Sequence, residues 1–204
     1  MGFELNYLEI LGTVVGLVYL WLEFKASIYL WIAGVIMPAI YIFIYYNAGL
    51  YADFGINIYY LIAAVYGWAC WMKGRRTKKS GDNSSIKELT ISYTPRRFYL
   101  PLIIVTLVAF VAIVFILFNF TDSNVPWLDS LTTALSIVGM WLLARKYIEQ
   151  WIIWIAVDIV SCGLYIYKGL YLTSALYGLY TIIAIFGYYE WRRLMTVEKS
   201  RDKE

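Results

Sequence analysis

The chain of 204 residues contains no histidine and only two cysteines, Cys70 and Cys162. Zinc and haem sites are built largely from these residue types, so we expect no metal site and no cofactor. No P-loop motif for nucleotide binding is present, which argues against ATP hydrolysis by this chain. No nucleophile–base pair is visible either, so we expect a protein that is not an enzyme. Both cysteines lie in apolar runs, where a small buried side chain is the usual role.

Charge is also scarce, at 15% of the residues, whereas 62% are hydrophobic and the mean hydropathy is +0.65. Apolar runs of about 20 residues recur, each long enough to cross roughly 30 Å of hydrocarbon. A β-barrel would show shorter, alternating segments instead. The composition therefore predicts an all-α polytopic membrane protein in contact with lipid. Glu4 and Glu9 stand where a signal peptide would be basic, so we expect no removable signal.

The apolar runs predict seven transmembrane helices, at about residues 7–23, 28–46, 51–72, 98–119, 127–145, 150–168 and 171–193. The break at 73–97 is rich in Lys and Arg, which predicts a flexible cytoplasmic loop. With this loop inside, 16 of the 17 basic residues are cytoplasmic, the exception being Lys168. The count therefore predicts an outside N-terminus and a cytoplasmic tail at 194–204. The net charge of +3 reflects this topology, and we expect no nucleic-acid partner.

The chain repeats itself at an offset of 120 residues, the difference between Trp31 and Trp151. Three of the matched pairs are tryptophans, and the pairs are Trp21 with Trp141, Lys25 with Arg145, Trp31 with Trp151, Tyr45 with Tyr165, Tyr60 with Tyr180, Gly67 with Gly187 and Trp71 with Trp191. The offset predicts two parallel three-helix repeats, a first copy at 1–72 and a second copy at 127–193, joined by a linker helix at 98–119. Parallel repeats with a substrate site between them are a transporter architecture.

The two copies differ where chemistry is expected. Asp158 of the second copy stands in place of Pro38, and Trp154 in place of Gly34. Proline removes a helical hydrogen bond, so Pro38 is a candidate hinge, although a static kink is equally compatible with it. The cation-binding features therefore belong to the second copy.

Asp158 is a carboxylate near the middle of an apolar run, where a charge costs about 3 kcal/mol or more. No basic residue stands at its depth in any predicted span, and aromatic faces beside a carboxylate suit an organic cation. One face of the helix carries the candidate binding residues Trp151, Trp154, Asp158 and Tyr165. Trp151 could instead be only an interface anchor, and Asp158 a buried hydrogen-bond partner.

Further candidate binding residues lie on three other predicted helices: Thr132, Ser136, Asn57, Tyr60, Tyr177 and Tyr180. Their alternative roles are structural. The tyrosines could join helices to one another, and the threonine and serine could bond to their own helix.

The segment Trp151-x-x-Trp154-x-x-x-Asp158, followed by Tyr165 and Lys168-Gly-Leu-Tyr171, resembles the signature of the Pnu family of bacterial vitamin transporters. The resemblance covers essentially the whole chain. It implies a SWEET-like 3+1+3 fold in the inner membrane, facilitated diffusion of an unphosphorylated B-vitamin, a homotrimer, and trapping of the substrate by a cytoplasmic kinase.

One position departs from that pattern, because the family's nicotinamide riboside transporters carry Asn where this chain has Asp158. A carboxylate only accepts hydrogen bonds and adds negative charge. Thiamin offers an amino donor and a thiazolium cation, and the family includes a thiamin-transporting subgroup, to which this chain shows the closer resemblance. We therefore expect thiamin as the substrate, with nicotinamide riboside as the alternative. A membrane receptor or scaffold with a ligand pocket is a more remote alternative.

Overall fold

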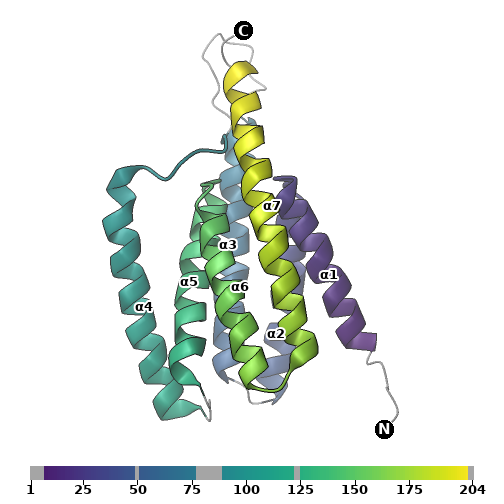
Figure 1. The fold of residues 1–204 in the computed structure, drawn as a ribbon, viewed down its shortest axis with the longest axis vertical. Coiled ribbons are helices and arrows are strands. Elements are labelled where there is room, and N and C mark those ends of the chain that lie inside the picture. The colour runs from purple at the N-terminus through teal and green to yellow at the C-terminus, as the bar shows by residue number, and fades with distance from the viewer. Residues whose placement is uncertain (1–6, 49–50, 77–88, 122–124, 202–204) are drawn as a thin grey trace. The chain divides into compact units, whose positions relative to one another are not determined.

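The computed structural model describes residues 7–48, 51–76, 89–121 and 125–201. Within these ranges the fold is all-helical, as the sequence predicts, with seven α-helices. Figure 1 labels them along the chain. They are α1 (Tyr7–Phe24), α2 (Leu30–Ala48), α3 (Tyr51–Arg76), α4 (Tyr99–Phe120), α5 (Pro126–Ala144), α6 (Gln150–Tyr167) and α7 (Tyr171–Arg201), with a short 3₁₀ helix η2 (Arg96–Phe98) before α4. Glu4 lies outside the described residues.

Two helices extend beyond their predicted ends. Helix α3 continues through Arg76 and α7 through Arg201, whereas the apolar runs end near residues 72 and 193. Arg, Lys, Glu and Met are good helix formers, so the backbone stays helical after hydrophobicity ends. The start of the predicted basic loop and most of the predicted tail are therefore helical.

Five of the described helices are long and apolar enough to cross a membrane, in agreement with a multi-pass protein. They correspond to α3 through α7, while α1 and α2 contribute the shorter apolar stretches Val14–Phe24 and Leu30–Phe43. Helix α4 is the most hydrophobic, with a hydropathy of 3.2, and it buries no residue within the structure. An apolar surface of this kind suits a helix in contact with lipid.

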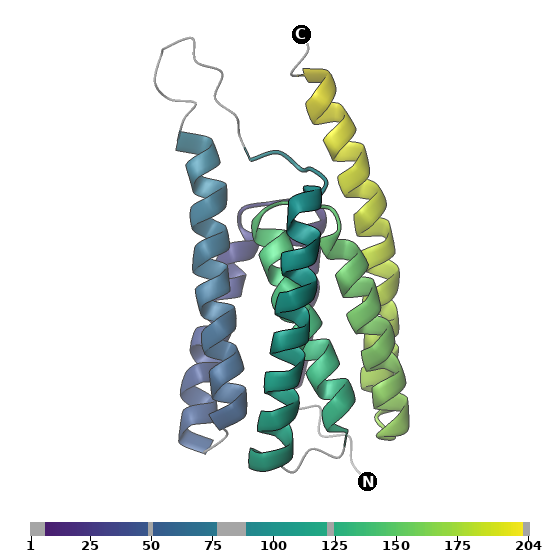
Figure 2. The same ribbon diagram turned by 90° about the vertical axis from the view of Figure 1, so that its left-hand side faces the viewer.

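The chain divides into two compact units, Met1–Ala69 and Cys70–Glu204. In the first, α1 packs on α2. In the second, α4 packs on α5, α5 on α6 and α6 on α7, as Figures 1 and 2 show. Helices α6 and α7 run antiparallel, and the turn between them passes through Gly169 at φ +74°, a conformation that glycine adopts without strain.

The turn between α1 and α2 and the turn between α5 and α6 have the same backbone geometry. Ala26 (φ 48°) and Lys146 (φ 55°) are the non-glycine residues with positive φ in the described chain, and they are 120 positions apart. The amides of Lys25, Ala26 and Ser27 donate to the carbonyls of Trp21, Glu23 and Leu22, and those of Arg145, Lys146 and Tyr147 donate to Trp141, Leu143 and Leu142. The two sets of donors and acceptors match one for one at the same offset.

A tryptophan packs on a glycine at matching places in the two units. A Cβ atom on Gly187 would lie 2.6 Å from ring atoms of Trp151, and a Cβ on Gly67 would overlap the ring of Trp31. Both tryptophans are fully buried. Glycine is required at both positions because the indole ring occupies the space that any side chain would need.

The residues just before η2 attach to the α5–α6 turn. The Ser92 amide donates to the Lys146 carbonyl (3.1 Å), and the Ile148 amide donates to the Ser92 carbonyl (3.0 Å). Both the amide and the hydroxyl of Thr94 donate to Oε2 of Glu149, at 2.9 and 2.7 Å.

Helix α7 holds the same segment through Glu198, whose Oε2 accepts from the amide of Ile91 at 3.0 Å. Ile91 and Thr94 are both buried. The expectation of a flexible loop throughout 73–97 is therefore wrong for residues 91–94, because two carboxylates accept hydrogen bonds from this backbone.

Candidate substrate-binding site

Asp158 lies in the middle of α6 and is 8% exposed. Its carboxylate forms neither a hydrogen bond nor an ion pair with any residue that the structure describes. Its electrostatic neighbours are the hydroxyls of Tyr177 and Tyr180 on α7. A nearly buried carboxylate that has no cationic partner among the described residues remains available to a cationic ligand.

The neighbouring tyrosines form a cluster between α6 and α7. The rings of Tyr165 and Tyr177 stack at 5.1 Å with an interplanar angle of 20°, and the ring of Tyr180 meets Tyr177 edge-on at 5.7 Å. Tyr177 therefore contacts both of the other two predicted binding residues of this cluster. The contacts also fit the alternative role, in which tyrosines join two helices.

Trp154 lies one turn before Asp158 on the same face of α6. Its indole ring packs against Gly139 of α5, where a Cβ atom would lie 3.4 Å from Cε2 and Cζ2 of the ring. The ring is partly exposed, and its buried Nε1 donates to none of the described residues. The small residue opposite lets the ring lie close to the backbone of α5, and the partial exposure of Trp154 leaves part of its side chain accessible.

Trp151 has different surroundings from Trp154. It is fully buried, meets Trp191 of α7 edge-on at 5.8 Å with an interplanar angle of 87°, and packs on Gly187. These contacts indicate a residue that joins α6 to α7. They leave it less suited than Trp154 to stack on a ligand, and a fully buried ring also does not fit the alternative of an interface anchor.

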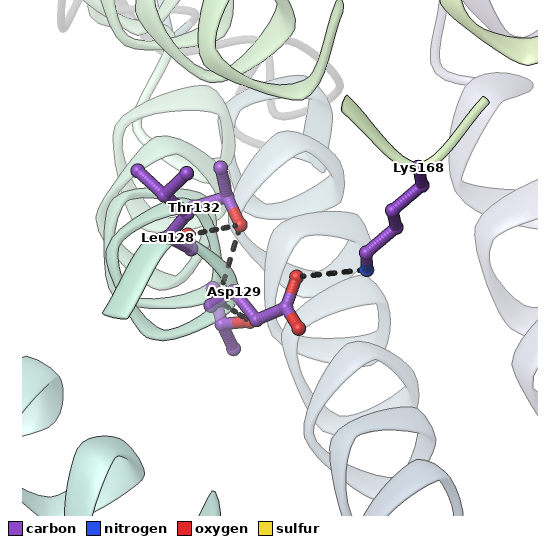
Figure 3. Close-up of polar contacts among 5 residues, drawn as sticks. Leu128, Asp129, Thr132 and Lys168 are labelled. Atoms are coloured by element: carbon purple, nitrogen blue, oxygen red, sulfur yellow. Dashed lines mark hydrogen bonds and ion pairs between the residues drawn. The ribbon is translucent and has the colours of Figure 1, made fainter. Parts of the chain in front are cut away.

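A cation lies at the end of the tyrosine cluster that is farther from the α5–α6 turn. Lys168 Nζ is 3.6 Å from Oδ1 of Asp129 on α5, as Figure 3 shows, and 5.9 Å from the ring centre of Tyr165. Both side chains are about one-third exposed. The sequence did not predict this pair. The available signals were that Lys168 is the one basic residue that the charge count leaves outside the membrane, and that Asp129 stands in the first turn of α5.

The hydroxyl groups of α5 are bonded to their own helix. Thr132 Oγ1 donates to the carbonyls of Leu128 and Asp129 at 3.1 Å each, as Figure 3 shows, and Ser136 Oγ donates to Thr132 at 2.8 Å. These contacts fit the alternative role that the sequence leaves open for both residues. Each oxygen can still accept a hydrogen bond from a ligand.

The remaining candidates lie in the first unit. Asn57 and Tyr60 are partly buried on α3, and the rings of Tyr59 and Tyr60 meet at 5.7 Å. Pro38 is buried, and α2 continues through it without a break in the helix. The role of Pro38 as a hinge stays a prediction.

These features define a class of protein: a multi-pass helical membrane protein with a carboxylate and aromatic rings at the depth of one span. The comparisons with known proteins then identify the family. The chain belongs to the nicotinamide mononucleotide transporter family, whose model matches residues 6–193. The predicted membership of the Pnu family is thus confirmed.

Individual relatives cover most of the chain. The nicotinamide riboside transporter PnuC of Escherichia coli K12 is 25% identical over 209 residues, covering 93% of this chain and 87% of its own length. The riboflavin/roseoflavin transporter RibM of Streptomyces davaonensis is 26% identical over 184 residues, covering 90% and 83%. The names of these relatives do not support a thiamin-transporting subgroup, and they favour the alternative of nicotinamide riboside.

The fold is also found in a solved structure. The crystal structure of the vitamin B3 transporter PnuC matches with a TM-score of 0.64 and 24% identity, over 90% of this chain and 80% of that one. At this level of identity the match supports the fold alone.

Proposed function

We propose that this protein takes up a cationic, unphosphorylated B-vitamin across the bacterial inner membrane by facilitated diffusion, and that nicotinamide riboside is its substrate. The Asp158 carboxylate carries the proposal, because it is nearly buried and forms no ion pair with a described residue. The pyridinium ring of nicotinamide riboside is a cation that suits this carboxylate and an aromatic face. The relatives named for this substrate support the choice.

The architecture proposed for this activity is two parallel three-helix repeats joined by α4. The matching turns at Ala26 and Lys146 and the matching tryptophan–glycine contacts support it. The basic residues support an outside N-terminus and a cytoplasmic C-terminus. Assembly as a homotrimer and trapping by a cytoplasmic kinase follow from the family resemblance and stay proposals.

Thiamin remains a second candidate because of one residue, Asp158, which stands where the resemblance leads us to expect Asn. A carboxylate suits the thiazolium of thiamin as well as it suits a pyridinium, and it also accepts from the amino group of thiamin. Nicotinamide riboside carries a carboxamide, with which Asn can pair as well, so the two candidates differ in what replacement of the carboxylate should do.

The test is a binding titration of purified protein with nicotinamide riboside and with thiamin, followed by uptake into proteoliposomes without an ion gradient. We expect nicotinamide riboside to bind and to equilibrate across the membrane. In Asp158→Asn, nicotinamide riboside binding should weaken less than thiamin binding, because Asn loses the charge that faces the pyridinium but both donates to and accepts from the carboxamide. Thiamin binding should fall about tenfold or more, since a hydrogen bond to a charged group contributes about 1.5–3 kcal/mol.

Two results would contradict the proposal. Binding of thiamin alone would reassign the substrate. Accumulation above the outside concentration that an ionophore abolishes would reject facilitated diffusion.

A further inference from the structure

Buried polar atoms without a hydrogen-bond partner among the described residues gather at the start of α6. Four of them belong to three residues, namely Nε2 and Oε1 of Gln150 and the Nε1 atoms of Trp151 and Trp154. Gln150 stands out because its side chain is 0% exposed and both ends of its amide are unpaired. Leaving a buried amide unpaired is unfavourable, so its presence calls for a role other than packing.

The corresponding residue of the first copy shows what packing alone requires. Leu30 stands 120 positions before Gln150 and is likewise 0% exposed at the start of its helix. The backbone contacts around the two are alike, since the amide of Leu30 donates to Ser27 and that of Gln150 donates to Tyr147, both at 3.2 Å. An apolar side chain therefore fills this place in a helix start of the same geometry.

The position of Gln150 relates it to the proposed site. Residues 150, 154 and 158 are spaced by four, so Gln150, Trp154 and Asp158 share one face of α6. At 1.5 Å per residue, Gln150 is about 6 Å from Trp154 and about 12 Å from Asp158 along the helix axis. It lies toward the α5–α6 turn, on the side opposite to the Lys168–Asp129 pair.

We infer that the Gln150 amide contacts the substrate as it passes between the level of Asp158 and the α5–α6 turn. A primary amide both donates and accepts hydrogen bonds, so it can pair with a carboxamide or with ribose hydroxyls, the polar groups of a nucleoside. It carries no charge and therefore does not hold a cation in place. The inference rests on the proposed function and adds a transit contact to it.

The test compares Gln150→Met and Gln150→Leu with the unaltered protein. Met is close to Gln in length and has no strong hydrogen-bonding group, and Leu is the residue of the first copy. Leu164→Met, a buried apolar change on the same helix, is the matched control. Three quantities are measured: the thermal midpoint, the affinity for nicotinamide riboside by tryptophan fluorescence, and its initial uptake rate into proteoliposomes.

We expect both Gln150 variants to fold with an unchanged or higher thermal midpoint. Their affinity for nicotinamide riboside should stay close to that of the unaltered protein, while uptake falls about tenfold, the effect of one hydrogen bond lost from the transport barrier. Leu164→Met should change none of the three quantities.

Unchanged uptake in a stable Gln150→Met protein would overturn the inference and leave the amide a site for structural water. A lower thermal midpoint in both variants would also overturn it, because the amide would then have a partner within the folded protein. If the unaltered protein neither binds nor transports nicotinamide riboside, the proposed function itself fails. That result is distinct from one in which only the Gln150 variants differ.

Discussion

Two turns have the same backbone hydrogen bonds, the one between α1 and α2 and the one between α5 and α6. The side chains next to these turns make different contacts. In the second copy, Glu149 accepts two hydrogen bonds from Thr94. Its counterpart in the first copy is Tyr29, which is 64% exposed. The shared backbone geometry supports the proposed repeat, while the hydrogen bonds from Thr94 are made by the residue of the second copy.

A second difference concerns the contact between the first two helices of each copy. In the first copy Tyr19 of α1 faces Gly34 of α2, where an added Cβ would lie 3.7 Å from the tyrosine ring. In the second copy Gly139 of α5 faces Trp154 of α6. The aromatic ring and the glycine have exchanged helices at matching positions. The contact is kept in both, but only the second copy carries its aromatic ring on the helix of Asp158.

The comparison leads us to propose a division between residues that maintain packing and residues that serve the substrate site. Trp151, whose partner Gly187 and counterpart Trp31 are repeated, falls in the first group. Trp154, Asp158 and Gln150, which replace Gly34, Pro38 and Leu30, fall in the second. Each of the following substitutions tests this division.

Trp151→Ala should have the largest effect, and the effect should be on stability. Removal of a buried tryptophan costs about 3–5 kcal/mol, because the cavity left between α6 and α7 cannot collapse fully. The thermal midpoint in detergent measures it, and Trp31→Ala should behave in the same way. A Trp151→Ala protein that is as stable as the unaltered one and only binds more weakly would move Trp151 to the site group.

Exchanging the aromatic ring and the glycine between positions 154 of α6 and 139 of α5 separates an effect on packing from an effect on binding. Trp154→Gly should weaken nicotinamide riboside binding about thirtyfold, since a desolvated cation–π contact is worth about 2 kcal/mol. Adding Gly139→Tyr recreates the arrangement of the first copy. This double variant should regain thermal stability without regaining affinity, and recovery of both would show that a ring on either helix serves the ligand.

Much of the fold was predictable because membrane helices are specified by composition. The runs that predict the seven helices agree with the structure to within a few residues except at the ends of α3 and α7. There the run of apolar residues ends before the helix does, so hydrophobicity alone underestimates the length. The turn geometry was not predictable, since Ala26 and Lys146 carry no residue signal for positive φ.

The site was predictable only in part. Asp158 and Trp154 stand out because charge and polarity inside an apolar run have few structural explanations. The packing role of Trp151 was ambiguous, because its spacing places it near the face of α6 that carries Trp154 and Asp158. Only the contact with Gly187 shows where its ring lies. Gln150 was missed because a polar residue at the start of a helix is ordinary, and its complete burial depends on the tertiary structure.

The smallest expected effect concerns the Lys168–Asp129 pair, which the first copy lacks because Ala48 stands at the position of Lys168. The pair is partly exposed, so Asp129→Asn should change stability by less than about 1 kcal/mol. Its charges should act on the approach of a cation instead. Lys168→Met should raise the initial uptake rate of nicotinamide riboside about two- to threefold at low salt, and Asp129→Asn should lower it by a similar factor. Both changes should shrink at about 1 M salt, where screening acts within roughly 3 Å.

The measurement is initial uptake into proteoliposomes at two ionic strengths. Thr106→Val on α4 is the control, because the hydroxyl of Thr106 donates to the carbonyl of Leu102 in its own helix. Effects of equal sign in the two variants would mean that the pair holds α5 to α6 and does not steer the ligand.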